Sequence, residues 1–258
     1  ICNSLSQMKN IILIGSGNVA THLGISLKKR GLNIVQVWSK NIKNAKILAS
    51  KLNCDCTNSL NQLKKADLYI LAVKDDVISK VLSKLQNIAI VHTSGSVSMD
   101  VFHNNFTNHG VFYPLQTFSK NSELDFSETP ICIEASNSEF ENKLINLGKQ
   151  LSGNVVKMNS EQRKQLHIAA VFACNFSNHM YTISDEILSK SNIDFKLLLP
   201  LINQTVKKLK DNKPSDVQTG PAKRDDKKII NIHLENIEDE ATKKIYQLIS
   251  NAIINSNE

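Results

Sequence analysis

Long apolar runs are missing from this sequence. The longest clear one, Leu68–Val73, falls far short of the roughly 18 residues that a membrane-spanning helix needs. The sequence therefore predicts no transmembrane segment. The seven residues before Met8 lack the basic head and the apolar core of a secretory signal. We expect residues 1–7 to be a ragged extension and the protein to be cytoplasmic.

Paired cysteines and stacking aromatics are also scarce. The five cysteines are scattered, without a C-x-x-C pair or a histidine spaced to complete a zinc site, which predicts reduced thiols and no metal site. The net charge of +7 comes with acidic residues interleaved among the basic ones and without aromatics suited to base stacking. These features argue against a nucleic-acid partner and favour an anionic small ligand.

What is present is enough apolar sequence to build a core. A chain of 258 residues with 41% hydrophobic content is compatible with one large domain or two smaller ones. Short apolar runs typical of buried parallel strands occur at Asn10–Ile14, Ile34–Trp38, Leu68–Val73, Ile88–Val91, Val111–Tyr113, Ile131–Glu134 and Val155–Met158. Helical stretches lie between the first of them, at Asn18–Arg30, at Lys43–Leu52 and from about Asp76. This alternation predicts an α/β fold with a doubly wound, mainly parallel sheet.

Strand signals stop after Met158. The stretch that follows, as far as Lys190, can form one long helix with Ser160 as its N-cap. Further helical signals follow in the stretches DFKLLLPLINQTVKKLK and NIEDEATKKIYQLISNAII. We therefore expect an α/β domain at residues 8–158 and an all-α domain at residues 159–258.

A glycine-rich turn joins the first strand to the first helix. The residues Gly15-Ser16-Gly17-Asn18-Val19-Ala20 fit the G-x-G-x-x-A pattern. The first glycine allows the tight turn, the second lets a pyrophosphate approach the backbone, and the small last residue lets helix and strand pack closely. The helix N-terminus then faces the phosphates. This context predicts a Rossmann dinucleotide-binding domain, with the cofactor at Gly15, Ser16, Gly17, Asn18 and Val19.

The end of the second strand indicates which dinucleotide binds. In NAD-specific folds an acidic residue about 20 residues after the glycines binds the ribose hydroxyls. Here that position reads Ser39-Lys40-Asn41, with Lys43 close behind. Hydroxyl, amide and ammonium groups can hold a 2′-phosphate, and no carboxylate is there to repel it. The sequence therefore favours NADP over NAD, and the alternative is that these are polar loop residues with loose selectivity.

Taken in order along the chain, the motifs GSGNVA, VWSK, ADLYILAVKDD, VHTSGS, YPLQTF and TGPAKRDD resemble a known family. Its members pair a Rossmann-like domain with a C-terminal helical domain of unknown function and are labelled NADP-dependent oxidoreductases. The family belongs to the wider group of pyrroline-5-carboxylate reductase and 6-phosphogluconate dehydrogenase. The resemblance implies the fold, the NADP cofactor and a homodimer formed through the helical domain. It does not supply the substrate.

The resemblance also assigns roles to single residues. It implies that Ala72, Val73 and the loop Thr93-Ser94-Gly95 border the nicotinamide half of the cofactor. His92, at a strand end, is either part of this site or a structural histidine. The TGPA stretch is similar to the Ser-Pro-Gly-Gly-Thr loop of pyrroline-5-carboxylate reductases but lacks the paired glycines and the threonine. That departure argues against proline synthesis.

A polar stripe on the long helix is the candidate for chemistry. At about 100° per residue, one face of an ideal α-helix carries His167, Val171, Cys174, Asn175, Asn178 and Thr182. His167 could supply a proton while Asn175 and Asn178 orient a carbonyl or imine. Lys164 is followed four residues later by isoleucine, so the Lys-x-x-x-Asn pair of 3-hydroxyacid dehydrogenases is missing. A solvated polar face is the alternative.

A histidine and an arginine outside the stripe are further candidates. His179 is turned away from the stripe, so a structural role is favoured. Arg224, beside TGPA, could bind an acidic substrate, although an exposed arginine in a basic loop is the commoner explanation. The sequence as a whole predicts an NADP-dependent oxidoreductase that acts on a small carbonyl or imine. The alternatives are a non-catalytic NADP-binding or redox-sensing protein and a deazaflavin-dependent NADP reductase.

Overall fold

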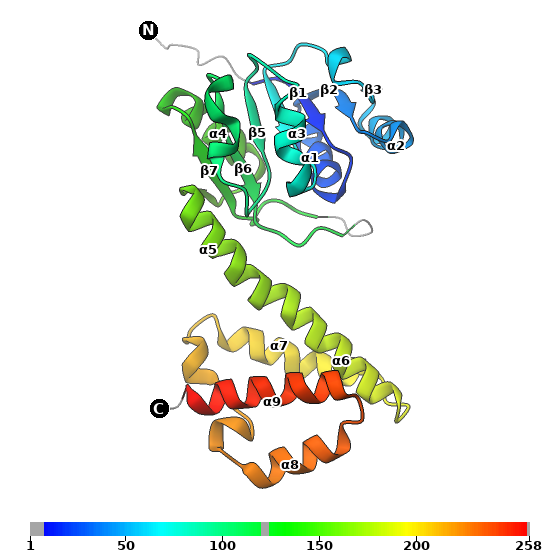
Figure 1. Ribbon diagram of the computed structural model, residues 1–258, viewed down its shortest axis with the longest axis vertical. Helices are drawn as coiled ribbons and strands as arrows, with labels where there is room; N and C mark the ends of the chain where they lie inside the picture. The colour runs from blue at the N-terminus through cyan, green and yellow to red at the C-terminus, as the bar shows by residue number, and fades with distance from the viewer. Residues whose placement is uncertain (1–7, 120–123, 257–258) are drawn as a thin grey trace. The chain divides into compact units, whose positions relative to one another are not determined.

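The computed structural model describes residues 8–119 and 124–256 of the 258. By its internal contacts the chain divides into two compact units, the first ending at Cys174 and the second beginning at Asn175 (Figure 1). The first unit contains every strand that the described residues form. The second contains only helices and turns. No helix among the described residues is both long enough and apolar enough to cross a membrane.

An eight-stranded sheet forms the centre of the first unit. Its strand order is β3-β2-β1-β4-β5-β6-β7-β8, and every neighbouring pair is parallel except β6 and β7. The strands are β1 (Asn10–Ile14), β2 (Asn33–Trp38), β3 (Asp55–Thr57), β4 (Leu68–Leu71), β5 (Ile90–His92), β6 (His109–Pro114), β7 (Ile131–Ala135) and β8 (Val155–Lys157).

Helices cover both faces of this sheet. On one face lie α1 (Asn18–Lys29), α2 (Ile42–Leu52) and α4 (Ser138–Leu151), and on the other lie α3 (Asp75–Leu82) and the 3-10 segment Met99–Asn105. Because side chains alternate along a strand, Ile11 and Leu13 of β1 enter the first core and Ile12 and Ile14 enter the second. The result is the predicted α/β fold, a doubly wound, mainly parallel sheet followed by a helical part.

The order of the strands positions a site. From β1 the chain moves outward to β2 and β3, and then returns to β4 on the other side of β1. In open α/β sheets, ligands bind at the carboxyl ends of the strands where the order reverses. The turn after β1 and the segments after β2 and β4 therefore meet at this switch point.

Two elements of the sheet unit were not predicted. Strand β3 has only three residues, one of them buried, which is too short for a visible alternation. Helix α4 begins after Asn137, whose side chain accepts a hydrogen bond from Phe140 N at 2.9 Å, and it buries Leu144, Leu147 and Leu151. Strand β4, predicted to reach Val73, ends at Leu71.

The predicted single helix after Met158 is corrected in two ways. Its N-cap is Asn159 and not Ser160, because Asn159 forms a capping box with Gln162. Helical structure runs through α5 (Ser160–Ala170) and α6 (Ser177–Ser189), but a π-helical segment at Val171–Phe176 separates them. Because a π-turn holds one residue more than an α-turn, later side chains rotate by roughly 100° against the predicted stripe.

The second unit consists of α6, α7 (Leu199–Lys208), α8 (Lys227–Asn236) and α9 (Glu240–Asn255), together with 3-10 turns. An ion pair of 2.7 Å joins Lys190 to Glu238, and His233 Nδ1 lies 2.8 Å from the Tyr246 hydroxyl. The last strand ends at Lys157, but the first compact unit extends to Cys174. It includes α5 because the first turns of this helix contact the sheet. A functional boundary at residue 159 stays a prediction.

Candidate functional site

The turn after β1 can be built only with glycine at its first position. Gly15 has φ +131°, and a Cβ atom there would lie 2.0 Å from the carbonyl oxygen of Ala72. Its amide donates to the carbonyl of Trp38 at 2.8 Å. The turn is therefore packed between the ends of β2 and β4, as the G-x-G-x-x-A pattern requires.

The N-terminus of α1 presents open backbone amides. Gly17 is the N-cap, and no described side chain forms a capping hydrogen bond there. A Cβ atom at Gly17 would meet no described atom within 4 Å, so the described residues leave the space above the turn open. The first turn contains no acidic residue. Free amides, the positive end of the helix dipole and open space are what a pyrophosphate needs.

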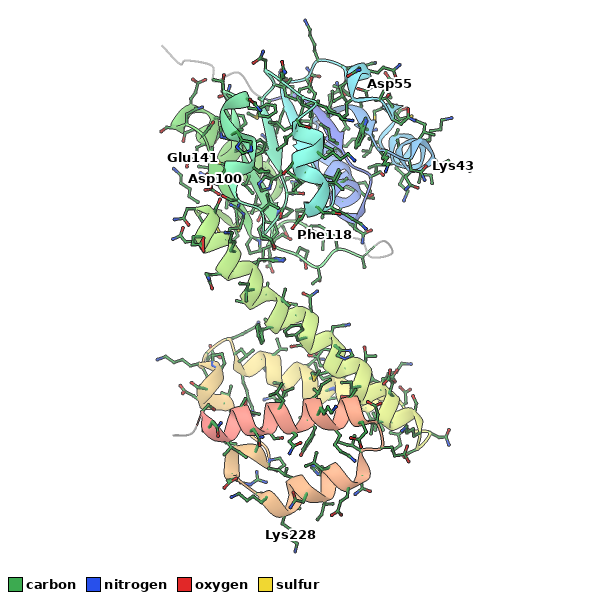
Figure 2. All side chains as sticks on the ribbon, in the orientation of Figure 1. Lys43, Asp55, Asp100, Phe118, Glu141 and Lys228 are labelled. Carbon is green, nitrogen blue, oxygen red and sulfur yellow. The ribbon has the colours of Figure 1, made fainter. Side chains whose placement is uncertain are left out.

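The segment that follows β6 is tied to the same helix. The side chain of Asn18 donates to the carbonyl of Phe118 at 2.9 Å, and His22 Nε2 lies 2.7 Å from the carbonyl oxygen of Ser119. Figure 2 shows Phe118 at the edge of the first unit. The amide of Asn18 is therefore engaged, and what this residue can offer an anion is its backbone N–H. Val19 is half-buried and packs against the core.

The end of β2 carries the polar group expected for nucleotide selection. Ser16 donates a hydrogen bond from Oγ to Ser39 Oγ at 2.9 Å, so the glycine turn and the end of β2 are joined. Lys40 is exposed. Asn41 caps α2 by accepting a hydrogen bond from Lys43 N at 2.9 Å, and Figure 2 shows Lys43 projecting from this helix. The first turn of α2 contains no acidic residue.

Charge favours an anion in the first unit of the chain. Acidic and basic residues balance from Asn175 onward, so the first 174 residues carry the whole net charge of +7. With the amides of α1 and Lys40 beyond Ser39, the donors present fit a phosphorylated dinucleotide.

The ends of β4 and β5 hold the residues expected near the nicotinamide. Thr93 donates from its amide to the carbonyl of Leu71 at 3.2 Å, which holds the two strand ends together. Ser94 Oγ accepts hydrogen bonds from the amides of Ser96 and Val97 at 3.1 and 3.0 Å. These bonds fold the loop back on itself and bring Gly95 over β6. Ala72 is buried and Val73 half-buried, one strand away.

Gly95 leaves room for a pair of side chains from distant parts of the sequence. The hydroxyl of Tyr113, on β6, lies 3.0 Å from Nδ1 of His167, on α5. A Cβ atom at Gly95 would lie 2.7 Å from His167 Nδ1 and 2.9 Å from Tyr113 Cζ. Any other residue here would collide with both rings. His167 therefore lies beside the loop that the resemblance assigns to the nicotinamide.

Tyr113 was not predicted as a site residue. It is 8% exposed, and burial raises the pKa of its hydroxyl to about 12, so it stays protonated at neutral pH. The nearby charge of Arg163 opposes this shift, and Asp75 and the Cys132 thiol add to it. Tyr113 belongs to the motif YPLQTF, which contributes to the family resemblance but assigns no function to any of its residues.

A buried ion pair fixes α5 against the sheet. Arg163 is fully buried, and its guanidinium donates to the carboxylate of Glu134 on β7 and, at 2.5 Å, to the carbonyl of Val97. Glu134 also accepts from the amide and hydroxyl of Ser160, at 2.9 and 2.8 Å. His167 follows Arg163 by one helical turn. The pair thus links the loop after β5, the sheet and the helix that carries His167.

His92 lies in the core at the end of β5. It is fully buried and stacks on Phe102 with ring centroids 5.5 Å apart. Its Nδ1 accepts a hydrogen bond from the amide of Ser94 at 3.2 Å. Burial, with the nearby charge of Arg163, lowers the pKa of His92 to about 3. A neutral imidazole that supports the Ser94 loop fits these contacts.

The remaining predicted residues belong to the second unit. Asn175 lies within the π-helical segment and Asn178 just after it, and both are exposed, as are His179 and Arg224. Gly220 adopts φ +106°, and Ala222 is buried. The three polar residues assigned to catalysis are thus divided between the units, His167 in the first and Asn175 and Asn178 in the second.

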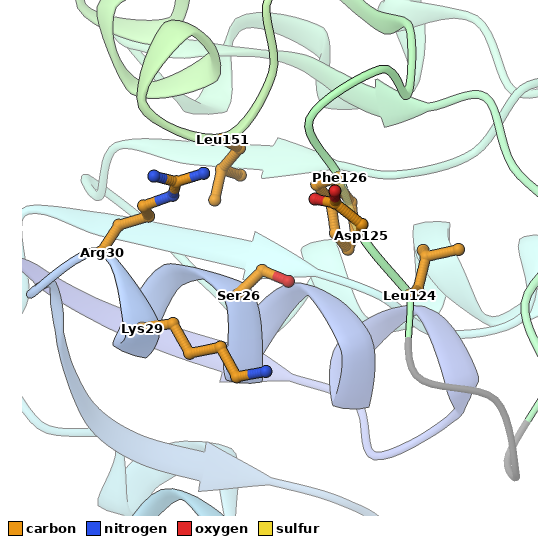
Figure 3. A pocket seen from close by; sticks show the side chains of 7 residues that line it. All are labelled: Ser26, Lys29, Arg30, Leu124, Asp125, Phe126 and Leu151. Atoms are coloured by element: carbon orange, nitrogen blue, oxygen red, sulfur yellow. The ribbon is translucent and has the colours of Figure 1, made fainter.

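One cavity of about 480 Å³ lies away from these residues. It is formed where the C-terminal end of α1 approaches the segment before β7 (Figure 3), and its lining residues are Ser26, Lys29, Arg30, Leu124, Asp125, Phe126 and Leu151. None of the predicted site residues lines it. Within the described chain, no cluster of histidine, cysteine, aspartate and glutamate residues could hold a metal ion.

Two family models match the chain. Residues 10–94 match the model described as "NADP oxidoreductase coenzyme F420-dependent", and residues 129–253 match "Domain of unknown function (DUF2520)". The structure is similar to that of a "putative NADP oxidoreductase" from Bacteroides fragilis, with a TM-score of 0.90 and 41% sequence identity, over 98% of this chain and 100% of that one. No curated protein matches the sequence.

More distant structures share the fold alone. A 1-pyrroline-5-carboxylate reductase from Streptococcus pyogenes has a TM-score of 0.66 and 15% identity, over 95% of this chain and 98% of that one. A reductive aminase from Aspergillus terreus has a TM-score of 0.63 and 10% identity, over 80% of this chain and 74% of that one.

Proposed function

Because the chain belongs to the family that joins an NADP oxidoreductase (coenzyme F420-dependent) domain to the DUF2520 domain, we propose that it is an NADP-dependent oxidoreductase. It transfers hydride between NADPH and a small carbonyl or imine substrate. The family and the Rossmann fold imply a pyridine dinucleotide. We propose three further points: the preference for NADP, the class of substrate and the identity of the catalytic residues.

One observation carries the choice of NADP. The Ser16–Ser39 hydrogen bond joins two hydroxyl groups at the end of β2, and Lys40 follows directly. In Rossmann folds, residues at the end of this strand contact the ribose of the dinucleotide. No carboxylate occurs between Ser39 and Lys43 to repel a 2′-phosphate. The free amides at the start of α1 would hold the pyrophosphate.

We expect the protein to bind NADPH more tightly than NADH. Titration can follow energy transfer to the cofactor from Trp38, the single tryptophan of the chain. Lys40→Asp puts a carboxylate beside the 2′-phosphate and should weaken NADPH binding by about tenfold or more, because like charges in contact are costly. NADH binding should be unchanged or stronger.

Lys46→Asp is the matched control, because this exposed lysine lies further along α2. It makes the same charge change without touching the end of β2, and its cofactor preference should stay that of the wild type. Equal affinity of the wild type for NADPH and NADH would contradict the NADP assignment. Equal losses for both cofactors in Lys40→Asp would contradict the role of Lys40.

His167 is the proposed proton donor. When bound, NADPH supplies a hydride to the carbon of the substrate. His167 in its imidazolium form would release one proton to the substrate oxygen or nitrogen and become a neutral imidazole, so that charge and atoms balance. Its position beside Gly95, in the loop assigned to the nicotinamide, supports this role. Asn175 and Asn178 are proposed to orient the substrate.

The name of the first family model favours a second candidate. The model that matches residues 10–94 is described as coenzyme F420-dependent. A deazaflavin could therefore accept the hydride in place of a carbonyl or imine. Reduction of coenzyme F420 by NADPH, followed by absorbance, distinguishes the two substrates at the same cofactor site.

We also propose that the chain forms a homodimer through its helical part. Leu197, Leu201 and Leu248 of the second unit are 71%, 65% and 72% exposed, and Val206 is 55% exposed. Between Asn175 and residue 256, the buried residues are only Ala222, Ile230 and Ser250. A monomer rarely leaves so many large apolar side chains in water, and a second copy of the same apolar surface is the partner that we propose.

Light scattering after size exclusion should give twice the chain mass of 28.8 kDa. The double variant Leu201→Asp/Leu248→Asp should shift it to the monomer, because two charges would be buried in an apolar interface. Ile47→Asp is the control, since Ile47 is 60% exposed on α2 of the first unit. A monomeric wild type, or a double variant that remains dimeric, would contradict this interface.

A further inference from the structure

We propose that Tyr113 is a positioning residue that occupies Nδ1 of His167, so that Nε2 is the nitrogen that exchanges a proton with the substrate. This inference rests on the proposed function, and it adds a residue that neither the motifs nor the family assigns.

Three segments meet at this pair. Gly95 comes from the loop after β5, Tyr113 from β6 and His167 from α5, and the last two are 54 positions apart. Their rings are nearly perpendicular, with centroids 6.0 Å apart and an interplanar angle of 75°. This edge-to-face arrangement brings the hydroxyl to Nδ1 at 3.0 Å. The absence of a side chain at Gly95 is what permits it.

The partner of His167 is held rigidly. Tyr113 packs with Val111 and Cys132 in a small core that Leu166 of α5 also contacts. The backbone of α5 is fixed one turn earlier by the buried Arg163–Glu134 pair. Both ends of the hydrogen bond are therefore attached to ordered structure, which is the condition for one side chain to orient another.

The free nitrogen of His167 lies on its other edge. His167 is half-exposed, and among the described contacts its only hydrogen bond is the one from Nδ1 to Tyr113. Which nitrogen of a histidine exchanges a proton is set by the hydrogen bond at the other nitrogen. With Nδ1 occupied, Nε2 is the nitrogen available to a substrate.

A tyrosine hydroxyl suits both charge states of its partner. Its oxygen can accept a hydrogen bond from Nδ1–H of an imidazolium. It can accept the same hydrogen bond from Nδ1–H of the neutral ring that remains after Nε2 has released its proton. The proton given to the substrate heteroatom comes from Nε2, and Nδ1–H stays with Tyr113. The charged and titratable groups that act on Tyr113 are Arg163 from α5, Asp75 from α3 and Cys132 from β7. None of them takes the proton in this step.

The test is nuclear magnetic resonance of the full chain labelled with ¹⁵N at its histidine rings. His167→Ala identifies the His167 signals by their loss. In the wild type the Nδ1 resonance should be that of a hydrogen-bonded nitrogen, and Tyr113→Phe should shift it toward the value of an unbonded one. Tyr69→Phe is the matched control, because the 5% exposed Tyr69 loses a comparable hydroxyl bond, to the carbonyl of Lys64 at 2.5 Å.

Binding and turnover complete the experiment. Tyr113→Phe should bind NADPH as the wild type does. Turnover is measured as NADPH oxidation with a panel of 2-keto acids, with and without ammonia. The kcat of Tyr113→Phe should fall about tenfold, which is the effect expected for the loss of one hydrogen bond. An Nδ1 resonance that is the same in the wild type and in Tyr113→Phe would overturn the positioning role. A wild type that does not bind NADPH would instead overturn the proposed function, whatever the resonance shows.

Discussion

Glu134→Gln is expected to lower the free energy of unfolding of the first unit by about 3–5 kcal/mol, because it leaves a buried guanidinium without its counter-ion. Arg163 is fully buried, and the carboxylate of Glu134 is its only anionic partner in the described structure. Glutamine keeps the shape of the side chain, so the change isolates the charge. Trp38, buried at the end of β2, reports urea unfolding of this unit by its fluorescence.

Glu139→Gln provides the control for this prediction. Glu139 pairs with Lys143 at 2.7 Å on the surface of α4 and is 72% exposed. The same substitution there should leave the free energy of unfolding nearly unchanged, because solvent screens an exposed pair. If Glu134→Gln changes stability as little as Glu139→Gln does, the buried pair does not anchor α5.

Gly17→Val is expected to abolish dinucleotide binding without unfolding the protein. The backbone of Gly17 has φ −78°, which any residue can adopt, and a Cβ atom there would meet no described atom within 4 Å. The valine side chain would instead occupy the space above the turn that the pyrophosphate enters. Energy transfer from Trp38 to NADPH should be undetectable at concentrations that saturate the wild type.

Gly15→Val separates the two roles of the turn. Its side chain would meet the carbonyl oxygen of Ala72 at 2.0 Å and would require a φ of +131°, so we expect it to destabilise the first unit as well as to lose the cofactor. Urea unfolding of both variants distinguishes these outcomes. Binding of NADPH by a folded Gly17→Val protein would mean that the cofactor lies elsewhere.

The sequence by itself was enough for those features in which neighbouring residues carry the whole signal. Gly15 to Ala20 lie within one turn, and the apolar run of β1 and the amphipathic face of α1 flank them directly, so the local pattern determined a dinucleotide turn. The polar residues at the end of β2 could be predicted for the same reason, because they directly follow an apolar strand. The seven predicted strands were all found, with ends shifted by a few residues, because buried parallel strands are continuous apolar runs.

Local periodicity was misleading in the helix that carries His167. An ideal α-helix was expected to place His167 and Asn178 on one face, but the π-helical segment at Val171–Phe176 changes the phase between them. Nothing in the apolar spacing of this stretch signals an extra residue in a turn. Such a segment depends on what each part of the helix packs against, which periodicity does not report.

Only the tertiary structure decided what surrounds His167. The sequence assigned Gly95 to the cofactor loop, but it marked Tyr113 only as a strand residue and gave Arg163 no role. They come together because β5 and β6 are neighbours and α5 folds back on β7, contacts between residues far apart in the chain. Such contacts depend on the register of strands and the docking of a helix, and side-chain spacing along the chain contains no information on either.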